Sequence, residues 1–208
     1  MKKFKTVLFS LLMGTLALSA VGCGQTTLDN GNTTTTSDSA GTTIKTETPT
    51  LPTDVELKTF TIKNGLYSID LPAHWIQDTV NTDILVVDMD DSRSLTAMVD
   101  YYPISTVAED MEGEDLDAFI KLYEEQGIPK LLSLAEATEL VNIEADNLIA
   151  AKAYELTVKV DENTTNKAYF VYAQTDNTFY SISISGDEAT YAENIEDLKY
   201  IPLTLTEY

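Results

Sequence analysis

From Val55 onward, apolar and polar residues alternate in short stretches that are separated by turn-forming residues. Alternation at every second position is typical of strands that bury one face. We expect strands over 57–63, 66–71, 84–87, 95–102, 152–160, 167–174 and 178–185. Asn64-Gly65 favours a tight hairpin between the first two strands, and Asp176-Asn177 joins the last two. The two faces of the last strand differ, with Tyr180, Ile182 and Ile184 on one and Ser181, Ser183 and Ser185 on the other.

A helical period replaces this alternation in two places. The first helix is predicted over Glu114 to Gln126, where acidic residues suit the positive end of the helix dipole and Gly127 and Pro129 end the helix. Its apolar face consists of Leu116, Phe119, Ile120 and Tyr123. A second helix is expected over about 188–198.

Strands outnumber helices, and tight turns join successive strands. The predicted fold class is therefore α+β with a mostly antiparallel β-sheet. The stretch 131–143 fits either a helical turn or a strand, although 140–143 has extended character.

Four features together resemble the PsbP-like domain. They are a strand followed by Leu71-Pro72-Ala73-His74-Trp75, an acidic hairpin, the helix 114–126, and a closing hairpin that ends in Phe179-Tyr180-Ser181-Ile182. The family is named for an extrinsic subunit of photosystem II and recurs in bacterial lipoproteins. The resemblance implies an α/β/α sandwich, in which helices flank both faces of the sheet, and a binding or assembly role without chemistry. The metal-binding residues of plant members have no counterparts that we can match, so the resemblance assigns no site.

The chain begins with the features of an export signal. A basic start, Met1 to Lys5, precedes the apolar run Val7 to Leu18, which at 12 residues is shorter than the roughly 20 that span a bilayer. Ala20-Val21-Gly22-Cys23 resembles the lipobox of bacterial lipoproteins, which usually carries Leu where this chain has Ala20. We expect residues 1–22 to be a signal peptide and Cys23 to be lipidated. The alternative is an ordinary secretory signal that leaves a free thiol.

The segment after Cys23 is predicted to be a tether. Residues 24–54 are rich in Thr, Ser, Asn, Gly and Asp and carry too few apolar groups to offset the entropy cost of ordering. As a flexible coil they would span on the order of 30 Å. We therefore expect a lipidated and disordered segment over 23–54, a globular domain over 55–208, and a location on the extracytoplasmic face of the cell membrane.

Charge narrows the range of partners. Without the signal peptide, ten basic residues face 34 acidic ones, a formal net charge of −24. Such a chain repels phosphate backbones, so we expect no nucleic-acid partner. The membrane contact is expected to come from the lipid on Cys23.

The residues that most catalytic sites need are scarce. His74 is the only histidine, Cys23 is the only cysteine, and no G-x-S-x-G motif occurs. Zinc catalysis draws on several His or Cys ligands. A pair of glycosidase carboxylates cannot be singled out among 34 acids. We therefore expect that the protein is not an enzyme.

Two weaker binding hypotheses remain. Asp88, Asp90 and Asp91 place carboxylates in one turn and are candidate Ca²⁺ ligands, and 161–163 repeats the pattern. Neither turn completes an EF-hand, and Asp is common in turns for local hydrogen-bonding reasons. Trp75 and Tyr101 are candidate sugar-stacking residues, as is Tyr169, although a single Trp beside a strand end more commonly fills the core.

These observations lead to one functional prediction and one alternative. We expect a non-enzymatic, lipid-anchored module that binds a protein or an envelope component close to the membrane. The alternative is a surface lipoprotein that binds a small ligand or Ca²⁺.

Overall fold

The computed structural model of the protein describes residues 45–80 and 83–208. Nine strands of this part form a large sheet in the order β1-β8-β9-β10-β11-β6-β5-β4, with β7 also paired to β9. They are β1 (Thr46–Glu47), β4 (Ile76–Gln77), β5 (Leu85–Asp88), β6 (Leu95–Pro103), β7 (Ala135–Ala137), β8 (Val141–Ile143), β9 (Ala150–Lys159), β10 (Thr165–Gln174) and β11 (Thr178–Asp187). Three more strands form a small sheet in the order β12-β3-β2, namely β2 (Leu57–Thr61), β3 (Tyr67–Pro72) and β12 (Thr206–Glu207).

The helices are short except for one. They are α2 (Ile104–Val107), α3 (Leu116–Gln126), α4 (Pro129–Leu132) and α5 (Glu188–Asn194), with single 3₁₀ turns η1 (Ala108–Asp110), η2 (Ile195–Leu198) and η3 (Ile201–Thr204). Both predicted helices are confirmed. The first begins at Leu116 because Asp115 is its N-cap, whose side chain accepts a hydrogen bond from the Ala118 amide at 2.9 Å.

The strand predictions are confirmed, with differences of a few residues at the ends. Among the described residues, every strand pair is antiparallel except that of β1 with β8, so the sheet is mostly antiparallel as expected. Gly65 in the first hairpin has a φ of 74°, a conformation that glycine adopts without steric cost. The ambiguous stretch 131–143 divides into the end of α4, β7 and β8.

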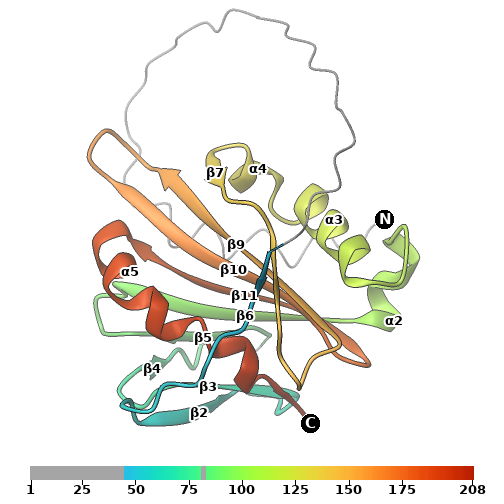
Figure 1. Ribbon diagram of the computed structural model, residues 1–208, viewed down its shortest axis with the longest axis horizontal. Coiled ribbons are helices and arrows are strands. Elements are labelled where there is room, and N and C mark those ends of the chain that lie inside the picture. The colour runs from blue at the N-terminus through green and yellow to red at the C-terminus, as the bar shows by residue number, and fades with distance from the viewer. Residues whose placement is uncertain (1–44, 81–82) are drawn as a thin grey trace, which may run out of the picture.

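The strands belong to two sheets, which the sequence analysis did not distinguish. The first hairpin, β2 and β3, pairs with β12 at the C-terminus instead of joining the large sheet (Figure 1). Alternation along a strand indicates which side chains share a face, but it does not indicate which strands pair.

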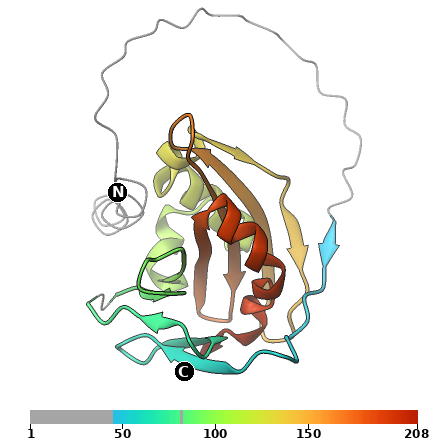
Figure 2. The same cartoon turned by 90° about the vertical axis from the view of Figure 1, so that its left-hand side faces the viewer.

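The two sheets enclose one of two hydrophobic cores. This inter-sheet core contains side chains from the small sheet, one face of the large sheet and the C-terminal segment, among them Phe60, Ile69, Leu71, Trp75, Val99, Val171, Tyr180, Ile182, Tyr191 and Ile201. Figure 2 shows the small sheet below the large one. Large side chains of β11 therefore face this core, as their alternation predicts.

The second core lies between α3 and the opposite face of the large sheet. This helix-side core contains Leu116, Phe119, Ile120, Leu122 and Tyr123 of α3, and Tyr154, Leu156, Phe170, Tyr172 and Phe179 of the sheet. Phe119 stacks on Phe179 with ring centroids 4.6 Å apart. Full burial of such a side chain contributes about 2–3 kcal/mol.

The folded part begins earlier than the predicted boundary at Val55. Thr46–Glu47 of the expected tether forms β1 and pairs in parallel with β8, at the edge of the large sheet (Figure 2). Two backbone hydrogen bonds hold it, from the Asn142 amide to the Lys45 carbonyl and from the Glu144 amide to the Glu47 carbonyl, each 2.9 Å. Backbone pairing does not require apolar side chains, so composition does not reveal it.

The predicted signal peptide 1–22, Cys23 and the tether up to residue 44 lie outside the described residues. In the two described ranges, no helix combines the length and apolar character that a membrane span requires.

Candidate functional site

Helix α3 covers only one end of the sheet face on which it packs. Paired residues of neighbouring strands point to the same side, so the face consists of rows that cross the strands. The row under Phe119 contains Phe179 and Tyr102, which pair with each other. Farther along the same strands, the residues that point to this side become small.

A hollow occupies the part of the face beyond α3. Its volume is about 380 Å³, within the ~300–1,000 Å³ range of small-ligand pockets. We call it the sheet hollow, and its lining residues are Ser92, Arg93, Ser94, Thr96, Met98, Leu131, Leu156, Val158, Asn166, Lys167, Ala168, Phe170, Ser183, Ser185, Gly186 and Asp187. They come from β6 and the turn before it, α4, β9, β10 and β11.

The serines of β11 explain why the hollow exists. Ser183 pairs with Phe170 on one side and Met98 on the other, and Ser185 pairs with Ala168 and Thr96. A large residue at either serine would occupy this space. The alternation of serines with Tyr180, Ile182 and Ile184 is visible in the sequence, and it was the one signal that could have located the site.

Ser183 is the most informative residue of the hollow. The residue is 6% exposed, and its hydroxyl has no hydrogen-bond partner among the residues that the structure describes. The hydroxyl is open to the hollow, whereas the fully enclosed hydroxyls without a partner are those of Tyr169, Tyr191 and Tyr200. Thr96, in the next row, donates to Asp88 at 2.6 Å. A hydroxyl that faces an open hollow can bond to water or to a bound molecule, as donor or as acceptor. The hollow therefore contains a polar group that a bound molecule could satisfy.

Arg93 lies at the rim of the hollow and organises the acidic hairpin. It is the only arginine of the sequence, and its φ of 58° is unusual for a residue other than glycine. Its Nε lies 3.2 Å from Asp88 and its Nη2 lies 3.7 Å from Asp78. Asp88 is 6% exposed, so the guanidinium compensates a buried carboxylate.

The structure does not bring the predicted Ca²⁺ ligands Asp88, Asp90 and Asp91 together. Asp88 is bound by Arg93 and Thr96, and Asp91 is exposed. Asp90 accepts hydrogen bonds from Ser92 and Ser94, which lower its pKa to about 2. Over residues 45–80 and 83–208, no group of three or more His, Cys, Asp or Glu side chains is placed to hold a metal ion.

The candidate sugar-stacking residues lie mostly inside the protein. Trp75 is 4% exposed and belongs to the inter-sheet core, which corrects its assignment as a binding residue. Tyr169 is 3% exposed in the same core. Tyr101 is half-buried against Tyr67, with ring centroids 5.5 Å apart. A single Trp beside a strand end fills the core here, because that end faces the second sheet. His74 is exposed.

Asp100 is a titratable group between the hollow and α3. It is half-buried on β6 and pairs with Ser181, one row closer to α3 than Met98 and Ser183. Loss of solvent raises the pKa of Asp100 to about 7. Its charge in turn contributes to the raised pKa values of Tyr102 and Tyr123, after the larger effect of their own burial.

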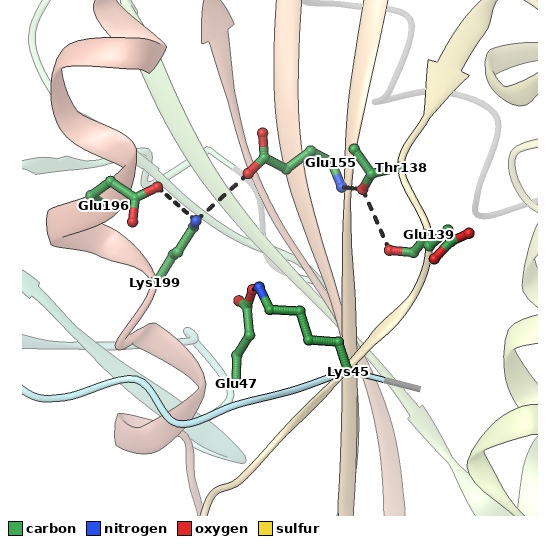
Figure 3. A network of polar contacts seen from close by, with 7 residues as sticks. All are labelled: Lys45, Glu47, Thr138, Glu139, Glu155, Glu196 and Lys199. Carbon is green, nitrogen blue, oxygen red and sulfur yellow. Dashed lines mark hydrogen bonds and ion pairs between the residues drawn. The ribbon is translucent and has the colours of Figure 1, made fainter. Parts of the chain in front are cut away.

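A second concave region of about 670 Å³ lies beside the edge strand β1. Figure 3 shows its polar contacts, in which Lys199 lies 2.7 Å from Glu196 and 3.7 Å from Glu155, and Lys45 lies 2.6 Å from Glu47. Burial lowers the pKa of Lys199, but the hydrogen bond to Glu196 and the neighbouring carboxylates raise it overall. The charged groups of this region are thus paired with one another, whereas the Ser183 hydroxyl of the sheet hollow has no protein partner among the described residues.

Comparisons with known proteins give no family assignment by sequence. No protein-family model and no curated protein matches the chain. Solved structures do match over 73% of it.

Three of these structures come from different bacteria. A Bacteroides thetaiotaomicron VPI-5482 structure matches at 12% identity with a TM-score of 0.44, and the match spans about half, 48%, of that chain. A Pseudomonas aeruginosa protein of unknown function matches at 12% identity over 97% of its chain, with a TM-score of 0.43. The cyanobacterial PsbP (CyanoP) of Synechocystis sp. PCC 6803 matches at 14% identity over 92% of its chain, with a TM-score of 0.50. The CyanoP match shows that this chain has a PsbP-like fold.

Proposed function

We propose that this protein is a membrane-anchored extracytoplasmic binding module that catalyses no reaction. In this proposal Cys23 carries the lipid, residues 24–44 form the tether, and the domain binds a protein or an envelope component. The observation that carries the proposal is the basic and apolar leader that ends in Ala20-Val21-Gly22-Cys23. A lipid with two acyl chains holds a domain stably on a membrane, whereas one chain is marginal.

The geometry of the domain supports the binding part of the proposal. The sheet hollow is concave, is floored largely by apolar side chains, and contains the unpartnered hydroxyl of Ser183. Small-molecule sites typically combine an apolar lining with a few polar groups. This observation favours the second candidate function, a lipoprotein that binds a small ligand, over a Ca²⁺-binding one.

We further propose that the layers correspond to the α/β/α sandwich of PsbP-like proteins. Helix α3, with α4, would be one helical layer, and α5 with the turns after it would be the other. In support, Phe119 of α3 belongs to the helix-side core, and Tyr191 of α5 belongs to the inter-sheet core. The small sheet would then be an addition to that architecture. A crystal structure with α5 away from the large sheet would contradict this assignment.

Cell fractionation tests the anchoring. We expect the wild-type protein in the membrane fraction, retained in high salt and released by detergent, because acyl chains and not charges hold it. Cys23→Ser should appear in the soluble extracytoplasmic fraction. Thr34→Ala, in the expected tether, is the control and should fractionate as wild type. Membrane retention of Cys23→Ser would contradict the proposal.

A further inference from the structure

The rows of the sheet hollow differ in polarity from one end to the other. The row nearest α3 contains Met98, Ser183 and Phe170. The next row contains Thr96, Ser185, Ala168 and Leu156. In the third row, Asp187 pairs with Asn166, which pairs with Val158. The hollow is therefore apolar at its inner end and polar at its outer end.

Burial shows which end is enclosed. Met98 and Phe170 are 6% and 2% exposed although both line the hollow, so the inner end is narrow. Leu131 of α4 lines it as well and is only partly buried. The outer end lies beside Arg93, whose side chain is 57% exposed. A molecule that fits must insert an apolar body and leave a polar head at the rim.

The hollow has donors that are free for a ligand only at some positions, because the hydroxyls of Ser92, Ser94 and Thr96 already donate to Asp90 and Asp88. The Ser183 hydroxyl has no protein partner among the described residues and is open to the hollow. The ion pairs of Arg93 use Nε and Nη2, and a guanidinium has five N–H groups, so Nη1 can donate to a head group. Both basic residues of this lining are ion-paired, Arg93 with Asp88 and Asp78 and Lys167 with Glu188 at 3.4 Å, so a head group would share these cations with the carboxylates.

We propose that the sheet hollow binds a small amphipathic molecule with an acyl or aryl body and a hydrogen-bond-accepting head group. The body lies between Met98, Phe170 and Leu131, and the head group faces Arg93 at the outer end. This inference rests on the proposed function, because it names what the binding module takes.

The test uses octanoate as the probe. Acetate is the control, because it has the same carboxylate head group but lacks the apolar body. Amide spectra of ¹⁵N-labelled residues 23–208 carrying Cys23→Ser, which contain every residue of both cores, are recorded as each probe is added. We expect octanoate to cause saturable shifts confined to β6, β10, β11 and α4, and acetate to cause none. Shifts that do not saturate, or that scatter over the surface, would overturn the proposal.

Two variants that fill the hollow test the location. Ser183→Leu fills the inner row and Ala168→Leu fills the next one, so each should weaken octanoate binding by about tenfold or more, which is about 1.4 kcal/mol. Thr61→Leu places the same side chain at an exposed position of the small sheet and should bind as the unsubstituted chain does. If one filling variant does not fold, the other decides. Unchanged affinity in a folded filling variant would overturn the proposal.

The binding test and the anchoring test fail separately. Octanoate is added to a chain without lipid, so the result does not depend on the membrane. Saturable binding together with membrane retention of Cys23→Ser would contradict the anchor alone. Correct fractionation without octanoate binding would contradict the ligand class alone.

Discussion

Arg93 shows how one residue replaces the predicted cation in the acidic hairpin. The carboxylates of this turn were candidate Ca²⁺ ligands, yet the guanidinium of Arg93 lies between Asp88 and Asp78, and Asp90 bonds to its own turn. The residue types were visible in the sequence. The left-handed backbone conformation of Arg93 could not be predicted from the sequence, because a positive φ is uncommon outside glycine.

Substitution of Arg93 should destabilise the protein by an amount that depends on the new residue. Arg93→Ala leaves the buried Asp88 with Thr96 as its remaining side-chain partner, so we expect a loss of about 1–3 kcal/mol in the free energy of unfolding. Arg93→Gly should lose about 0.5–1 kcal/mol less, because glycine adopts this φ without strain. Urea unfolding measures both, with the exposed Lys63→Ala as control. Equal stabilities of the Ala and Gly variants would contradict the strain argument.

Asp100 should make stability depend on pH. Its pKa is about 7 in the folded protein and 3.8 as the ordinary value, so the folded state holds the proton more tightly. Stability should therefore fall as pH rises from about 4 to about 7 and remain lowered above that. Asp100→Asn removes the charge. We expect Asp100→Asn to raise the free energy of unfolding by about 1–2 kcal/mol at pH 8 and by little at pH 4. The gain at pH 8 is smaller than a fully buried carboxylate would give, because the side chain is half-buried.

Thermal unfolding at pH 4 and pH 8 tests this expectation. Asp91→Asn is the control, since Asp91 is exposed in the neighbouring turn. A gain of the same size at both pH values would show that the effect of Asp100→Asn is not due to ionisation.

At the scale of elements, α3 determines where the hollow begins. Its apolar positions and its end near Gly127 could be predicted from spacing and helix-ending residues. The part of the sheet face that α3 leaves uncovered could not be predicted, because the extent of that part depends on where the helix lies on the sheet. For the same reason, Ser183 and Ser185 were visible as one face of a strand but not as the floor of a site.

Removal of the α3 N-cap should weaken this element. Asp115→Ala leaves the Ala118 amide without its acceptor, and we expect a loss of about 1 kcal/mol in the free energy of unfolding. The matched control is Glu114→Ala, at the exposed position just before the cap, which should change stability little. Chemical unfolding followed by circular dichroism compares the two variants. A control that loses as much as Asp115→Ala would rule out a capping role.

Strand partners were the part of the fold that the sequence could not supply. The long strands β9, β10 and β11 follow each other and pair in order, so turns and alternation sufficed for them. The small sheet instead joins β3 near the start of the domain to β12 at its end. The two-residue strand β1 is too short for any periodic signal. Only long-range contacts distinguish these pairings.

At the scale of the whole molecule, two sheets and α3 enclose two cores on a PsbP-like fold, and β1 is the point at which the chain enters it. In our proposal the lipid on Cys23 keeps this domain close to the membrane, where small amphipathic molecules are concentrated. In this proposal the anchor places the domain where its ligand is found, and the shape of the sheet hollow selects the ligand.

Mass spectrometry of the N-terminal peptide, taken from protein extracted from membranes with detergent, tests the anchored state most directly. The account predicts a peptide that begins at Cys23, lacks residues 1–22, and carries the added mass of a diacylglyceryl group on the thiol. A peptide that begins at another residue, or that contains Cys23 with an unmodified thiol, would contradict it.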